Sequence, residues 1–142
     1  MELQRQEKSY WCGNACYAMI TGVSQKEARK ECQTRYTGTS SYSVKKALEN
    51  RGYQVISINI DNDYRCLKTH LKLLSKEYYI YCSNIFISNS GKGRNSKRRH
   101  ATVIWREKFY DPSEDFVCDL DCLEHLYNKQ FVIRQVLLIK KP

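Results

Sequence analysis

Apolar residues in the first third of the chain recur at helical spacing and are separated by residues that favour helix ends. Residues 13–20 are the first such segment, and Gly22 follows them as a C-terminal cap. Ser24 stands three residues before Glu27, the spacing of a capping box, and starts a second short helix that reaches Cys32. We therefore predict two short helices, followed by a polar loop that contains glycine.

A third helix and a change to strand-like alternation come next. Residues 43–51 carry apolar positions about one helical turn apart and stop at Gly52. Residues 53–58 are rich in β-favouring side chains and alternate as a strand does. Asp63 is placed to cap a helix over residues 64–74. Two further apolar stretches are typical of strands, residues 78–82 and 85–87.

The last third of the chain is mostly strand-like. Residues 100–105 and 108–110 flank a two-residue turn and predict a hairpin, and residues 131–139 predict a final strand. A short helix is expected over residues 122–128, and the glycine-containing basic stretch 88–99 predicts a mobile loop. Because helices come first and strands later, we expect an α+β fold with N-terminal helices packed on a C-terminal antiparallel sheet.

Length and composition limit the class of protein. With 142 residues, 42% hydrophobic and 27% charged, the chain suits a single domain over residues 1–142. It has no apolar run of about 18 residues and no secretory signal, so we expect a cytoplasmic domain outside the membrane. Seven cysteines cannot all pair within one chain, and most are expected to be reduced and buried. Cys32, Cys66 and Cys82 fall in predicted helix or strand interiors.

The net charge of +9, from 24 basic and 15 acidic residues, favours acidic partners. Five basic residues cluster in the predicted loop, namely Lys92, Arg94, Lys97, Arg98 and Arg99. The simpler interpretation of this basic cluster is a solvent-exposed loop that only connects two strands. The functional one is a surface that binds an acidic peptide or a phosphate backbone and steers it to a neighbouring site. Nucleic acid is the less favoured partner, because aromatic and basic residues do not interleave as in a stacking platform.

Four residues have the chemistry and the order that a thiol nucleophile needs. Thiolate attacks a carbonyl, and Cys12 opens a predicted helix whose N–H groups and dipole lower a thiol pKa. His100 is the candidate imidazolium, and the predicted hairpin returns Asp111 beside it, where a carboxylate orients the ring. Gln6 carries an amide that can donate to the oxyanion formed in acyl transfer, beside the Cys12 N–H.

This pattern resembles a known family of peptidases. Gln6, then five residues, then Cys12-Gly13-Asn14-Ala15-Cys16 resembles the opening of the C39 peptidases, papain-like domains that clip double-glycine leader peptides. The apolar strand after His100 and the Tyr110-Asp111-Pro112 segment resemble that family's His strand and Asp-Pro turn. The resemblance implies a papain-like fold, a peptide or isopeptide substrate, and a set of roles: Cys12 nucleophile, His100 general base and acid, Asp111 orienting residue, Gln6 oxyanion donor.

Some features depart from that family or leave alternatives open. The hairpin between His100 and Asp111 is short, and the sequence shows no transmembrane or ATPase portion, so we expect a stand-alone enzyme and do not carry over leader removal. Trp11 stands where a small or acidic residue is typical and is a candidate for the substrate-pocket wall. The same triad suits a transferase or a deamidase. A basic binding module without catalysis is the alternative from another class.

The remaining cysteines and histidines give weaker signals. Cys118, Cys122 and His125 are spaced C-x₃-C-x₂-H, but zinc sites need four ligands and no second pair lies nearby. Cys16 is expected in the core and His70 on a helix surface. We therefore expect neither a metal nor a cofactor.

Overall fold

The computed structural model describes residues 1–35, 38–90, 94–123 and 130–142, without the side chains of residues 86–90, 94–98 and 130. Its helices are α1 (Cys12–Thr21), α2 (Gln25–Cys32), α3 (Ser41–Asn50), α4 (Tyr64–Leu74) and a 3₁₀ turn, η1 (Leu120–Cys122). Its strands are β1 (Gln54–Asp63), β2 (Tyr79–Ser90), β3 (Arg94–Trp105), β4 (Lys108–Tyr110), β5 (Val117–Asp119) and β6 (Gln130–Lys140). The fold is α+β, as the sequence predicts.

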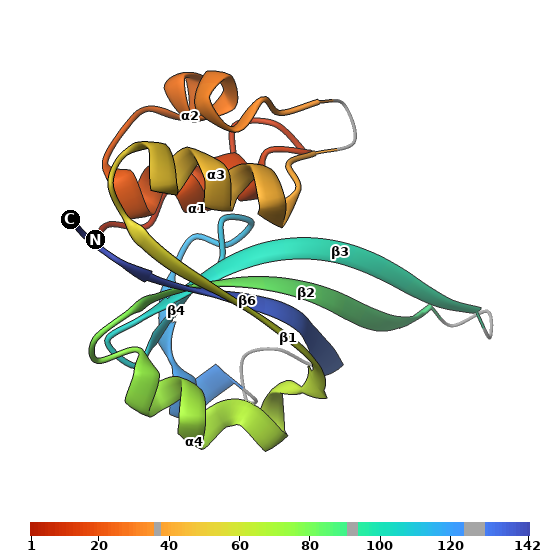
Figure 1. Ribbon diagram of the computed structural model, residues 1–142. Coiled ribbons are helices and arrows are strands. Elements are labelled where there is room, and N and C mark those ends of the chain that lie inside the picture. Colours follow the sequence, from red (N-terminus) through yellow and green to blue (C-terminus); the bar gives the residue numbers. More distant parts are fainter. Residues whose placement is uncertain (36–37, 91–93, 124–129) are drawn as a thin grey trace.

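The described strands form one sheet in the order β1-β6-β2-β3-β4-β5. Each neighbouring pair runs antiparallel, and β6, which follows all other strands in the chain, lies between β1 and β2. Helices α1 to α3 cover one face of the sheet and α4 covers the other (Figure 1). The predicted packing of N-terminal helices on an antiparallel sheet is confirmed, and α4 adds a third layer.

The central strands bury side chains on both faces. Tyr81 of β2 and Leu137 of β6 pack with α1, α2 and α3. Their neighbours Cys82 and Leu138 belong to a second cluster with Leu71 of α4. Successive side chains of a strand point to opposite faces, so a strand between two helical layers needs apolar residues at every position. This explains the unbroken apolar run at residues 136–139.

Helix α1 is buried nearly all round, from Gly13 to Ile20. It lies between the sheet and the outer helices, which requires an apolar surface on all sides. A Cβ at Gly13 would lie 3.1 Å from Thr39 Cβ and 3.2 Å from Tyr81 Oη. Glycine therefore lets the N-terminal end of α1 approach the sheet closely, and this contact fixes where residue 12 is presented.

The predicted caps of α1, α2 and α4 are confirmed, whereas the helix predicted over residues 43–51 begins two residues earlier and runs from Ser41 to Asn50. Gly22 takes the left-handed conformation (φ 81°) that ends α1. Ser24 caps α2 by accepting the Glu27 N–H at 3.1 Å, and Asp63 caps α4 by accepting the Arg65 N–H at 2.8 Å. These caps use contacts within three residues, so the sequence pattern contains all of the information they need.

The prediction of a mobile basic loop over residues 88–99 is wrong. The two predicted strands over residues 78–82 and 85–87 form a single strand, β2, which begins at Tyr79 and continues to Ser90, and β3 already begins at Arg94. The two strands pair in register from Ile80 with Ile104 to Ser90 with Arg94. Main-chain hydrogen bonds between strands stabilise this arm, and they do not depend on which side chains the strands carry. Lys92 lies outside the described residues.

Three smaller differences concern the rest of the chain. Strand β5 is not predicted. Of the helix expected over residues 122–128, Cys122 ends the 3₁₀ turn and Leu123 is helical, while residues 124–129 lie outside the described part. Cys32 and Cys82 are buried as expected, but Cys66 is exposed, because it faces away from the sheet on α4. No helix in the described ranges is long and apolar enough to cross a membrane.

Candidate active site

Cys12 is the first residue of α1, and the helix start leaves main-chain N–H groups beside its thiol. Trp11 occupies the N-cap position and makes no side-chain capping bond, in contrast to the capped helices α2 and α4. His100 and the main-chain N–H groups of Gly13 and Ala101 lie close enough to the thiol to lower its pKa. Donors and the positive end of the helix dipole both favour a negative charge here.

The hairpin brings His100 and Asp111 together as the sequence predicts. Val103 of β3 pairs with Tyr110 of β4, and the two turn residues have φ values of 48° and 64°, as a tight two-residue hairpin requires. His100 Nε2 lies 2.5 Å from Asp111 Oδ1, and the two residues are 7% and 2% exposed. Since Nε2 is directed at the carboxylate, Nδ1 is the ring nitrogen left for the thiol of Cys12.

Asp111 has a second partner that the sequence reading missed. Ser113 donates to Asp111 Oδ1 twice, from its main-chain N–H at 2.9 Å and from its hydroxyl at 2.7 Å. The signal was present, because an Asp that starts a turn commonly accepts from the residue two positions later. Ser113 therefore holds the carboxylate in the orientation in which it meets His100.

The charges of the three groups support one another. Burial raises the pKa of the Cys12 thiol, but the bond and charge of His100 and the two N–H donors outweigh it and lower the pKa overall. Burial lowers the pKa of His100, whereas Asp111 and Cys12 raise it, to about 9. Burial raises the pKa of Asp111, but His100 and Ser113 bring it below its ordinary value. At neutral pH this favours thiolate beside imidazolium beside carboxylate.

Gln6 lies next to both halves of the site. Its main-chain N–H donates to Pro112 O at 2.8 Å, so it adjoins the turn that carries Asp111. Its side-chain Nε2 donates to the carbonyls of Lys8 (3.1 Å) and Ser9 (2.9 Å), in the turn before α1. The Oε1 atom is buried without a hydrogen-bond partner among the described residues. For Nε2 to donate to an oxyanion, the Gln6 amide must give up its hydrogen bond to the carbonyl of either Lys8 or Ser9.

The other candidate substrate-binding residues are only partly placed. Trp11 is 5% exposed, with the Arg29 guanidinium 5.9 Å from its ring centroid, so a substrate would meet little of it. Arg99 is exposed, one residue before His100. Lys92 lies outside the described residues, and Arg94 and Arg98 are described by their main chain alone, on β3.

The weaker cysteine and histidine signals add no site within the described residues. Cys16 is fully buried one turn after Cys12, and burial raises its pKa well above the ordinary value. His70 is exposed on α4. Cys118 is buried and Cys122 exposed, while His125 lies outside the described part. No group of three potential ligands that could hold a metal occurs in the described ranges.

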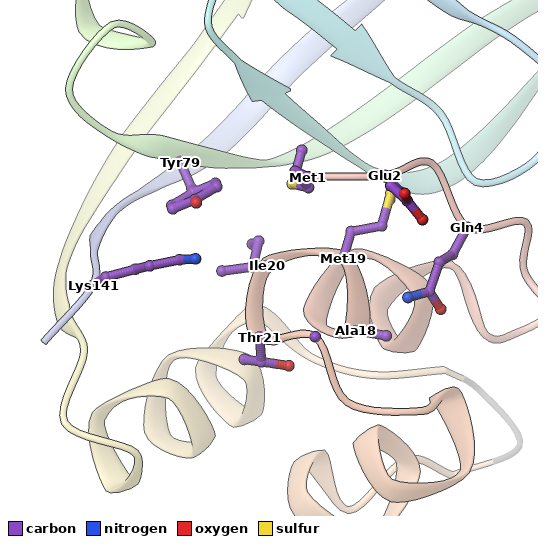
Figure 2. Close-up of a pocket in the computed structure, with 10 residues that line it drawn as sticks. Met1, Glu2, Gln4, Ala18, Met19, Ile20, Thr21, Tyr79 and Lys141 are labelled. Carbon is purple, nitrogen blue, oxygen red and sulfur yellow. The ribbon is translucent and has the colours of Figure 1, made fainter.

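A cavity of about 340 Å³ lies at the opposite end of α1 from the thiol. Figure 2 shows Ile20 of that helix end facing Met1, Tyr79 and Lys141, while Met19 extends toward Glu2. None of the three triad candidates lines it. The reactive groups and this cavity are therefore separate features of the molecule.

Solved peptidase domains share this fold along nearly the whole chain. The peptidase domain of Streptococcus ComA, a bi-functional ABC transporter involved in a quorum-sensing pathway, matches with a TM-score of 0.65 at 14% identity, covering 99% of this chain and 98% of that one. A double glycine motif protease from an AMS/PCAT transporter, in complex with its leader peptide, gives 0.63 at 17% identity, covering 99% and 91%.

Both neighbours are C39 peptidase domains, so the resemblance seen in the sequence is confirmed at the level of the fold. At these identities the likeness concerns the fold. No protein-family model matches the sequence. A search of curated proteins likewise found no match.

Proposed function

We propose that this chain is a papain-like cysteine peptidase that hydrolyses a peptide or isopeptide bond through an acyl-enzyme on Cys12. One observation carries the proposal: Cys12, at the start of a buried helix, lies close enough to His100 for each to shift the pKa of the other, and His100 is bonded in turn to buried Asp111. Nucleophile, base and orienting group in this order are the signature of covalent acyl transfer. A peptide substrate is supported by the fold shared with peptidase domains.

Acylation begins with the ion pair. The Cys12 thiolate attacks the substrate carbonyl, and negative charge moves to the carbonyl oxygen. The Cys12 main-chain N–H and an N–H of the Gln6 amide donate to that oxygen. His100, as imidazolium, gives its proton to the leaving amine, the C–N bond breaks, and a thioester remains on Cys12.

Deacylation reverses the role of His100. The ring, now neutral, accepts a proton from water as the water oxygen attacks the thioester carbonyl. The C–S bond breaks, the acid product leaves, and the thiolate–imidazolium pair is restored. Asp111 stays ionised throughout and holds the ring, because a carboxylate in this position stabilises the imidazolium and does not take up its proton.

The alkylation rate of each cysteine tests the nucleophile directly. We expect iodoacetamide to label Cys12 fastest, at a pH well below the free-thiol pKa of about 8.5, and we expect this advantage to vanish in His100→Ala. Cys66 and Cys122 are exposed and serve as internal controls with ordinary access. Mass spectrometry between about pH 5 and 9 reads all sites at once. Cys12 labelling that follows Cys66 at every pH would refute the proposal.

The dependence of peptide turnover on pH tests the role of His100 as the proton donor. Because the pKa of His100 is raised to about 9, the proton that it gives to the leaving amine is lost as the pH rises through that value. Peptide turnover should therefore fall above about pH 9, while alkylation, which needs the thiolate alone, should stay fast. Parallel decline of both rates would contradict the assigned role of His100.

A further inference from the structure

The buried side chain of Gln25 holds the main chain on both sides of Gln6. Gln25 is the first residue of α2 and is 5% exposed. Its Nε2 donates to the Arg5 carbonyl at 2.6 Å, and its Oε1 accepts the Glu7 N–H at 3.0 Å. In a parallel pair of strands, one residue bonds the carbonyl of residue i−1 and the N–H of residue i+1 on its partner, so this amide substitutes for a neighbouring parallel strand.

The opposite edge of the same segment meets the Asp111 turn. The N–H of Gln6 points away from Gln25 and donates to Pro112 O at 2.8 Å. Arg5 adds an exposed ion pair with Asp115 at 2.6 Å. Residue 6 is therefore fixed from one side by a helix and from the other by the turn that carries the orienting carboxylate.

The side chain of Gln6 extends this link to the nucleophile. It donates to the carbonyls of Lys8 and Ser9, and the Lys8 carbonyl also accepts the Trp11 N–H at 3.0 Å, directly before Cys12. The amide that the proposed mechanism uses thus connects the two halves of the site. Its position depends on the main chain at residues 5–7, and Gln25 sets that main chain.

We propose that Gln25 is a positioning residue for acyl transfer, which acts by holding Gln6 where its amide reaches the developing oxyanion. The inference rests on the proposed function. It assigns a role to a residue that contacts neither the thiol nor the imidazole. Loss of the Gln25 amide should slow steps that build an oxyanion and leave the thiolate as reactive as before.

Two reagents separate these effects. Acylation by p-nitrophenyl acetate proceeds through a tetrahedral oxyanion: the Cys12 sulfur bonds to the acetyl carbon, p-nitrophenolate leaves, and water later releases acetate and the thiol. Alkylation by iodoacetamide is a direct displacement of iodide at a methylene carbon and forms no oxyanion. The first rate reports thiolate and oxyanion hole together, and the second reports the thiolate alone.

The variants are chosen to keep volume and remove hydrogen bonds. Gln25→Met preserves side-chain length and loses both bonds. We expect its acylation rate to fall about tenfold or more and its alkylation rate to stay within about twofold of wild type. Gln6→Ala should lose about 10²-fold in acylation. In the Gln6→Ala background, Gln25→Met should cost nothing further, because a residue that acts through Gln6 has nothing left to position.

Gln135 offers a matched control. Its amide also joins separate segments, accepting from Ser41 and donating to Ser57 at 2.7 Å, but it lies on β6 and belongs to none of the proposed machinery. Gln135→Met should leave both rates unchanged. Gln25→Leu, which also loses both bonds and adds no buried charge, provides a second variant if Gln25→Met does not fold, and we expect the same pattern of rates.

Several outcomes would overturn the inference. Acylation by Gln25→Met within twofold of wild type would do so, as would an equal loss in the Gln6→Ala background. Equal slowing of alkylation would show that Gln25 supports the whole site instead of Gln6. Wild-type Cys12 that neither alkylates selectively nor acylates would remove the proposed function itself. Selective alkylation with acylation unaffected by Gln6→Ala would leave the triad standing and remove Gln6 and Gln25 together.

Discussion

Asp111 is the buried carboxylate that interacts with both His100 and Ser113. Its Oδ1 accepts from Ser113 and faces His100 Nε2, and the residue is almost fully buried. A buried carboxylate with opposite charge and donors on one oxygen stays ionised, and it raises the pKa of the imidazole in return. The reactivity of Cys12 is thus set partly by a group that it does not touch.

Asp111→Asn tests that dependence. The amide keeps the shape of the carboxyl group and removes its charge, so the pKa of His100 should fall from about 9 towards its ordinary value of 6.5. An NMR titration of the imidazole measures the shift, and peptide turnover should drop about 10²-fold or more, because a neutral partner also favours the wrong tautomer. Asp121→Asn, which removes exposed ion pairs with Lys68 and Lys72 of α4, is the control. An unchanged His100 titration would refute the role of Asp111.

At the scale of elements, the placement of α1 decides where the thiol lies. The helix start packs against Thr39 and Tyr81 so closely that a methyl group at Gly13 would require these neighbours to shift by a few tenths of an ångström. Because interiors are close-packed, an added methyl group there displaces the backbone or the neighbouring side chains. The contact between Gly13 and β2 is therefore a geometric condition for the alignment of Cys12 with His100.

Gly13→Ala should disturb this alignment more than it disturbs the fold. We expect a loss of about 1–3 kcal/mol in the free energy of unfolding, the range typical of overpacking, and slower alkylation of Cys12 at pH 6. Adding Tyr81→Phe removes the Oη contact and should recover part of both losses. Urea denaturation and the labelling rate measure them. A Gly13→Ala variant with wild-type labelling would show that the close contact does not position the thiol.

Local signals account for the parts that the sequence predicted well. Ser24 and Asp63 bond to main-chain groups within three residues, and the turn between β3 and β4 joins adjacent strands, so Asp111 could be placed beside His100 by spacing alone. The paired strands β2 and β3 were not predicted over residues 88–99, because the polar and basic side chains there favour a loop. Main-chain pairing between the strands determines the conformation instead. The contacts of Gln25 could not be predicted, since its bonds to Arg5 and Glu7 join residues about twenty positions apart and leave no local pattern in the sequence.

At the scale of the whole molecule, the two cores share their central strands. Strands β2 and β6 contribute alternate side chains to the cluster under α1 to α3 and to the cluster under α4. If β2 and β6 separate from the helices on one face, the apolar side chains that these strands contribute to the other face lose their packing as well. This arrangement predicts one cooperative unit, as is common for single domains of this size.

Urea unfolding should therefore show a single transition. Tryptophan fluorescence reports mainly on the α1 side, through Trp11 and Trp105, and far-UV circular dichroism reports on all helices and strands. We expect the two signals to give the same midpoint and the same slope. Leu71→Ala, in the opposite core, should shift both midpoints equally. Separate transitions would show that the α4 layer unfolds independently.

The position of β6 also has a consequence for synthesis. This strand is made after every other element, yet it lies between β1 and β2 and pairs with both. While residues 130–140 are still inside the ribosome, β1 has no partner on the sheet and the surface beneath α1 is incomplete. Cys12, although translated early, should gain its reactivity only after the chain has been released far enough for β6 to insert.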